Sequence, residues 1–124
     1  MGKLKSLTRG LDPNCCSYSY CGNYETLEIH TLNERLAIDY FGGEALTQVR
    51  FSGKAKRMRR TIDGLGISTS WPTNAGEKVF HRFRQSLDDL DEGEVTIQQN
   101  IRPGKELQFY GVLSRLVNYY KSQR

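Results

Sequence analysis

The 124-residue sequence has no long hydrophobic run, two histidines and three cysteines. No apolar stretch approaches the roughly 20 residues that a transmembrane helix needs. No hydrophobic signal-peptide core follows the basic N-terminus. We therefore expect an intracellular protein that is soluble or peripheral to a membrane. No spacing of the two histidines brings a nucleophile, a base and oxyanion donors together, so we predict no enzyme and no small-molecule substrate.

The cysteines lie close together in the chain, at Cys15, Cys16 and Cys21, so they do not form a disulfide framework. Thiolates of these residues and the imidazole of His30 are ligand types that zinc prefers, and His81 would be a distant fourth ligand. The CxxC spacing of structural zinc sites is absent, however. We expect reduced thiols, and we predict no metal and no other cofactor.

The first six residues, Met-Gly-Lys-Leu-Lys-Ser, fit the pattern for N-myristoylation of Gly2. A single myristoyl chain holds a membrane only marginally, so a second signal is needed. Basic side chains attract anionic lipid at roughly 1 kcal/mol each, and cysteine thiols can be palmitoylated. The candidates for these two roles are the basic residues Lys3, Lys5 and Arg9 and the cysteines Cys15 and Cys16.

The formal net charge is +4, but the charges are grouped in two runs of opposite sign. The basic run covers residues 54–60 and contains Lys54, Lys56, Arg57, Arg59 and Arg60. The acidic run covers residues 88–94 and contains Asp88, Asp89, Asp91, Glu92 and Glu94. The basic run predicts contact with nucleic-acid phosphates or with an anionic membrane. The alternative is a solvated strand edge or loop.

Equal and opposite runs also suggest self-association. If the two runs lie on different faces, the basic run of one molecule can meet the acidic run of another, and a weak, salt-sensitive homo-oligomer results.

The chain divides into two parts. Residues 1–23 are rich in Lys, Ser, Gly, Asn and Cys without clear periodicity, and we interpret them as a mobile or loosely packed N-terminal arm. Residues 24–124 form a single compact α+β domain, because their apolar residues follow both strand and helix periods.

Apolar residues alternate with polar ones in three short segments, 24–30, 36–41 and 46–51, which predicts an antiparallel β-meander. Another strand is predicted within 95–101, and a short one between Ile67 and Trp71.

Two helices are predicted, near 75–90 and 109–121, because apolar residues recur there at helical spacing. Asn74 followed by Glu77 resembles a capping box at the start of the first helix. A hairpin of residues 79–85 and 95–99 is the competing interpretation. We expect both helices to pack on one face of the sheet.

These features favour a non-enzymatic peripheral membrane protein at the cytoplasmic face of a membrane. Its layout, an acylated basic arm on a compact body, resembles that of a small viral matrix or adaptor protein. The alternative is a soluble nucleic-acid-binding protein that uses the 54–60 run, such as a viral RNA-binding or silencing-suppressor protein. The nucleus is then a second expected location. Residues 63–66, Asp-Gly-Leu-Gly, lack the Gly-Lys-Ser/Thr ending of a P-loop and predict only a turn.

Overall fold

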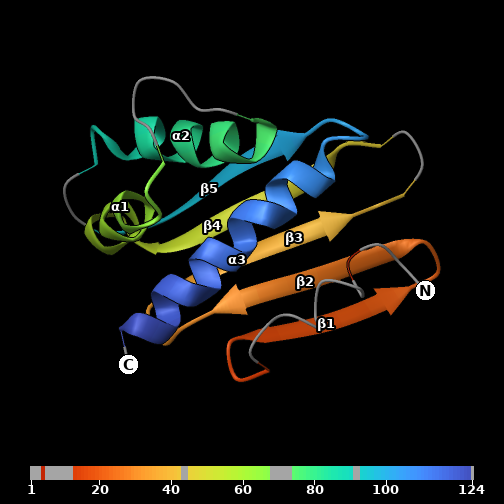
Figure 1. Cartoon of the computed structure of the whole chain (residues 1–124), viewed down its shortest axis with the longest axis horizontal. Helices are drawn as coiled ribbons and strands as arrows, with labels where there is room; N and C mark the ends of the chain where they lie inside the picture. The colour runs from red at the N-terminus through yellow and green to blue at the C-terminus, as the bar shows by residue number, and fades with distance from the viewer. Residues whose placement is uncertain (1–3, 5–12, 43–44, 68–73, 91–92, 124) are drawn as a thin grey trace.

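The computed structural model describes residue 4 and residues 13–42, 45–67, 74–90 and 93–123. The described chain forms one five-stranded antiparallel sheet and three helices, which confirms the predicted α+β fold (Figure 1).

The strands lie across the sheet in chain order, so the first four form a meander. They are β1 (Cys16–Cys21), β2 (Tyr24–His30), β3 (Glu34–Tyr40), β4 (Thr47–Lys54) and β5 (Glu94–Ile101). The alternating segments that predicted strands correspond to β2, β3, β4 and β5. The sequence did not predict β1, which lies in the range interpreted as the N-terminal arm and pairs along its whole length with β2.

The helices are α1 (Ala55–Gly64), α2 (Ala75–Leu87) and α3 (Glu106–Ser122). The two predicted helices are α2 and α3, and the competing hairpin is wrong. The side chain of Asn74 accepts a hydrogen bond of 2.9 Å from the backbone N–H of Glu77, which confirms the predicted N-cap. Ile67 is not in a strand, and Trp71 lies outside the described residues.

The third helix, α1, was not predicted, because five basic residues between positions 54 and 60 obscure its apolar side. Ala55, Met58 and Ile62 are nevertheless spaced three and four residues apart and are buried. The basic run therefore lies mainly on a helix that packs on the core, not on a strand edge or loop.

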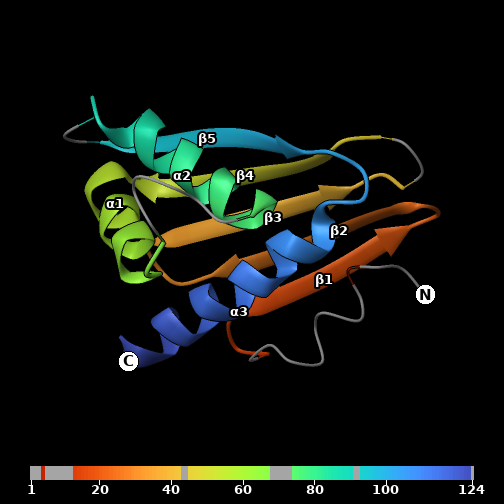
Figure 2. The ribbon, with the colours of Figure 1, turned by 45° about the horizontal axis from the view of Figure 1, so that its top comes forward.

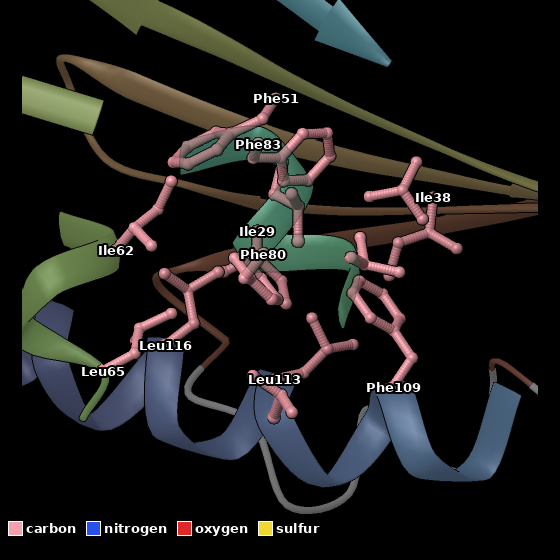
Figure 3. Close-up of a cluster of buried hydrophobic side chains, with 14 of the residues drawn as sticks. Ile29, Ile38, Phe51, Ile62, Leu65, Phe80, Phe83, Phe109, Leu113 and Leu116 are labelled. Atoms are coloured by element: carbon pink, nitrogen blue, oxygen red, sulfur yellow. The ribbon is translucent and has the colours of Figure 1, made fainter. Parts of the chain in front are cut away.

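All three helices cover the same face of the sheet (Figures 1 and 2). The alternating apolar residues of β2, β3 and β4 point into this layer. Phe80 of α2 lies at its centre, with ring centroids 5.8 Å from Phe83 and 5.7 Å from Phe109 of α3 (Figure 3). Burying one such side chain contributes roughly 1.5–3 kcal/mol, so this cluster is a main source of stability.

The other face of the sheet is polar and has one buried carboxylate, that of Asp39. This carboxylate accepts hydrogen bonds from the Tyr24 hydroxyl at 2.8 Å, from Thr26 at 3.1 Å and from the Arg50 guanidinium at 2.8 Å. The charge of Asp39 is thus compensated within the face, which favours its burial.

The meander gives the sheet two distinct ends. The Leu4 end holds Leu4, the β1–β2 turn, the β3–β4 loop and the start of α3. The α1 end holds α1, the β2–β3 turn and the C-terminus of α3 (Figure 1). A seven-residue strand such as β2 separates the two ends by roughly 20 Å.

Two helix glycines are expected to respond oppositely to alanine. A Cβ on Gly76 of α2 would lie 2.4 Å from the backbone oxygen of Gln108 and 2.7 Å from the Cα of Phe109 in α3, so the two helices would have to separate. A Cβ on Gly111 would meet nothing within 4 Å. We predict that Gly76→Ala lowers the free energy of unfolding by about 1–3 kcal/mol.

Gly111→Ala is the matched variant, and it should raise the free energy of unfolding by about 0.5–1 kcal/mol because alanine favours the helix. Urea denaturation of both variants measures whether each substitution raises or lowers the free energy of unfolding. Equal effects would contradict the close α2–α3 contact.

Candidate functional site

The basic run presents most of its charge to solvent. Lys54 at the end of β4 is exposed, and so are Lys56, Arg57 and Arg60 on the outer side of α1. None of these four forms a salt bridge with another described residue, whereas Arg35, Arg50, Arg84 and Arg115 do. Four cations are thus available to an anionic ligand.

The fifth residue of the run, Arg59, has an internal role. Its guanidinium donates a hydrogen bond of 2.9 Å to the backbone oxygen of Leu87 and another to that of Leu90, at the C-terminus of α2. The Leu87 carbonyl also accepts from the Leu90 N–H, and Arg59 adds a charged donor at the end of α2, where the helix dipole favours a cation. Arg59 thus links α1 to the C-terminus of α2 by hydrogen bonds.

Neighbouring arginines of α1 should therefore differ in their effect on stability. We predict that Arg59→Ala lowers the free energy of unfolding by about 1–3 kcal/mol, because it leaves carbonyl groups without their charged donor. Arg60→Ala, which removes the same charge from an exposed position, should change it by less than about 0.5 kcal/mol. Thermal and urea denaturation of the pair measure this difference, and equal losses would contradict the assignment.

A pocket of about 600 Å³ opens beside α1 at the α1 end of the sheet. The residues that line it come from four elements and the turns between them. They include Asn14, Cys15, His30, Leu32, Asn33, Glu34, Arg57, Arg60, Thr61, Tyr119, Tyr120 and Gln123. We call this the α1 pocket. The sequence analysis named Arg57 and Arg60 as binding residues but did not associate them with His30, Glu34 or Tyr119.

Glu34 is a buried carboxylate in the α1 pocket. The Thr61 hydroxyl lies 2.7 and 2.8 Å from its two oxygens, and the Tyr120 hydroxyl donates to one of them at 2.8 Å. Burial raises the pKa of Glu34, and the two hydroxyls and the positive charge of Arg57 partly oppose this. Burial and the neighbouring Glu34 raise the pKa of Tyr120, so its hydroxyl stays a donor.

The raised pKa of Glu34 makes stability depend on pH. Between its ordinary pKa of 4.5 and its higher value in the folded state, the folded protein binds more protons than the unfolded chain. Stability from this group is therefore lost as the pH rises through that window. We predict that Glu34→Gln, which cannot ionise, gains stability relative to wild type as the pH rises from about 4 towards 7.

Urea denaturation of wild type and Glu34→Gln at a series of pH values measures this difference, in which the other carboxylates cancel. A difference that shrinks as the pH rises would contradict the prediction.

The ends of the acidic and basic runs meet at one strand pair in the described part of the chain. Lys54 pairs with Glu94 across β4 and β5, and Asp88 binds Arg84 of α2 at 2.7 Å. Asp89 is exposed, and Asp91 and Glu92 lie outside the described residues. The head-to-tail self-association expected from the sequence stays a prediction.

Strand β1 separates Cys21 from the adjacent pair Cys15 and Cys16. Cys15 is buried in the α1 pocket and Cys16 is half-buried, whereas Cys21 is exposed at the opposite end of the strand. The ligands of the zinc site considered from the sequence, which included Cys21 and His30, are therefore not together. No group of three or more metal-ligating side chains occurs in the described parts of the chain. Because the Cys15 thiol is buried, it is poorly accessible for the palmitoylation predicted from the sequence.

The Leu4 end exposes large apolar side chains. Among the described residues, six large hydrophobic side chains are exposed, and five of them are at this end. They are Tyr20 (70 % exposed), Tyr24 (39 %), Phe41 (41 %), Leu46 (45 %) and Leu107 (79 %). The sixth, Leu32, lies at the α1 end. The sequence analysis missed this surface, because exposure cannot be read from residue type alone.

Leu4 is fixed at this end. Its side chain is fully buried, and its backbone N–H donates a hydrogen bond of 3.2 Å to the Glu25 carboxylate. The Tyr18 hydroxyl donates to the same carboxylate oxygen at 2.7 Å. The predicted lipidation residue Gly2 and the predicted contact residues Lys3, Lys5 and Arg9 lie outside the described residues.

No family model matches the chain, and neither the curated proteins nor the solved structures contain a match. Within the described residues, no helix combines the length and the apolar character needed to cross a bilayer.

Proposed function

We propose that this protein is a non-enzymatic peripheral membrane protein that docks on a bilayer through the Leu4 end. The observation that carries the proposal is that five of the six large apolar side chains exposed among the described residues lie at that end, with the rings of Tyr24 and Phe41 5.1 Å apart. Exposed apolar side chains that are grouped, rather than scattered, are typical of membrane or protein contact sites.

The kinds of side chain at the Leu4 end suit the membrane interface. Tyrosine has an apolar ring and a polar tip, which places it at the level of the lipid headgroups. Leu107, on the first turn of α3, offers a purely apolar side chain. Arg102 and Lys105 are exposed in the preceding loop and would attract anionic headgroups at roughly 1 kcal/mol each.

Leu4, which lies at the same end, is close in the chain to the acylation signal. Gly2 precedes Leu4 by two positions, and two residues span at most about 7 Å. A myristoyl chain on Gly2 would therefore begin near the Leu4 end. Such a chain alone binds marginally, so the side chains of this end would supply the second signal in place of palmitoylated Cys15.

The test is flotation with vesicles of phosphatidylcholine and phosphatidylserine. The full chain would be produced in cells with and without N-myristoyltransferase, as wild type and as the double variant Tyr20→Ser, Leu107→Ser. We predict that the double variant weakens binding of the myristoylated protein about tenfold or more, because each inserted side chain contributes on the order of 1 kcal/mol.

Leu32→Ser is the matched control, because it removes a fully exposed leucine from the opposite end. It should leave vesicle binding unchanged. Equal losses in the control and the double variant would contradict docking through the Leu4 end, as would binding that depends on neither the acyl chain nor Tyr20 and Leu107.

A further inference from the structure

We propose that the α1 pocket binds single-stranded nucleic acid, with the phosphates on Arg57 and Arg60 and one base against Tyr119. This ligand class is distinct from the lipid proposed for the Leu4 end, and the inference does not rest on membrane binding.

The guanidinium groups of Arg57 and Arg60 are positioned to bind phosphate. Arg57 and Arg60 are three residues apart on α1, so they are neighbours on one side of the helix. Both line the α1 pocket, both are exposed, and neither has a salt-bridge partner among the described residues. A guanidinium binds phosphate oxygens in a planar, two-pronged arrangement, which suits successive phosphates of a strand.

The nearest carboxylate competes little for these arginines. The oxygens of Glu34 already accept hydrogen bonds from Thr61 and Tyr120, on the inner side of the pocket. The carboxylate is buried, whereas the two guanidiniums are exposed. An incoming phosphate therefore meets positive charge first.

Tyr119 provides a fixed aromatic surface. Its half-buried ring lines the pocket and packs so closely on Gly64 of α1 that a Cβ at that position would lie 2.3 Å from the ring. A ring held in this way loses little conformational freedom when a base stacks on it. Stacking on an aromatic ring beside a basic groove is how proteins bind unpaired strands without sequence preference.

The remaining lining suits a nucleotide better than a lipid headgroup. Asn14, Asn33 and Gln123 present amide groups, and His30 an imidazole, which can hydrogen-bond with base edges or a ribose hydroxyl. The volume of about 600 Å³ is that of a small-molecule site and accommodates one nucleotide. A paired base cannot reach such a site without leaving its duplex, so the strand must be single.

The experiment is fluorescence anisotropy of the full, unacylated chain with short labelled single-stranded RNA, single-stranded DNA and duplex DNA, at several salt concentrations. Vesicles of phosphatidylcholine and phosphatidylserine form a separate arm. We expect Arg57→Ala, Arg60→Ala to weaken single-strand binding at least tenfold and to reduce the salt slope by about 1.4, since two phosphate contacts are lost.

Lys78→Ala, Arg82→Ala is the matched control, because it removes two exposed cations from the surface of α2. It should change affinity less than threefold. Tyr119→Ala should weaken binding roughly tenfold, consistent with the loss of one stacked base, while Tyr119→Phe should retain it. The Arg60→Ala single variant, at an exposed position, keeps the test valid if a change at Tyr119 or Arg57 lowers stability.

Equal effects of the α1 and α2 double variants would overturn the proposal, because binding would then follow net charge alone. Vesicle binding that requires Arg57 and Arg60, without binding of either single strand, would also overturn it and would identify the pocket as a lipid-headgroup site. Failure of this experiment leaves the flotation result at the Leu4 end unaffected, so the two proposals are tested separately.

Discussion

The structure depends on covering one apolar face of a five-stranded sheet. Leu27, Ile38 and Phe51 on neighbouring strands all point to that face and are fully buried by the helices. Phe80 stands between the rings of Phe83 and Phe109, so it links α2 to α3 above the strands. A sheet with one apolar face cannot remain open on that face, and this requirement determines where every helix lies.

The helices and the covered sheet face bury each other's apolar side chains. The ends of the sheet are therefore available for contact with ligands. The ends of β1 and β2, the β3–β4 loop and the first turn of α3 expose tyrosine, phenylalanine and leucine side chains at the Leu4 end. The α1 end exposes cations around a pocket. The two proposed activities, membrane contact and nucleic-acid binding, thus occupy opposite ends of one sheet and would not compete for the same surface.

The charged residues near α1 illustrate how packing divides a uniform run. Arg59 is turned towards the C-terminus of α2, where two carbonyl oxygens accept its hydrogen bonds. Arg60, the next residue, points to solvent and lines the pocket. On a helix, successive side chains are rotated by about 100°, so adjacent arginines must meet different surroundings. Packing also determines the surroundings of Glu34. Its carboxylate is buried, and the hydroxyls of Thr61 and Tyr120 donate the hydrogen bonds that compensate for the burial.

The sequence predicts the local structure correctly where apolar residues repeat regularly. Alternation in residues 24–30 and 46–51, and the Asn74 cap of α2, predicted elements that the structure confirms, because these signals act over a few neighbouring residues. It did not reveal β1, whose position depends on pairing with β2, or α1, whose apolar side is outnumbered by charges. Three relations became visible only in the folded chain: Arg59 is the structural arginine, Tyr119 lines the same pocket as Arg57, and Tyr20 and Leu107 lie at the same end of the sheet. Those relations join residues far apart in the chain, and burial and proximity arise only when the sheet and helices pack together.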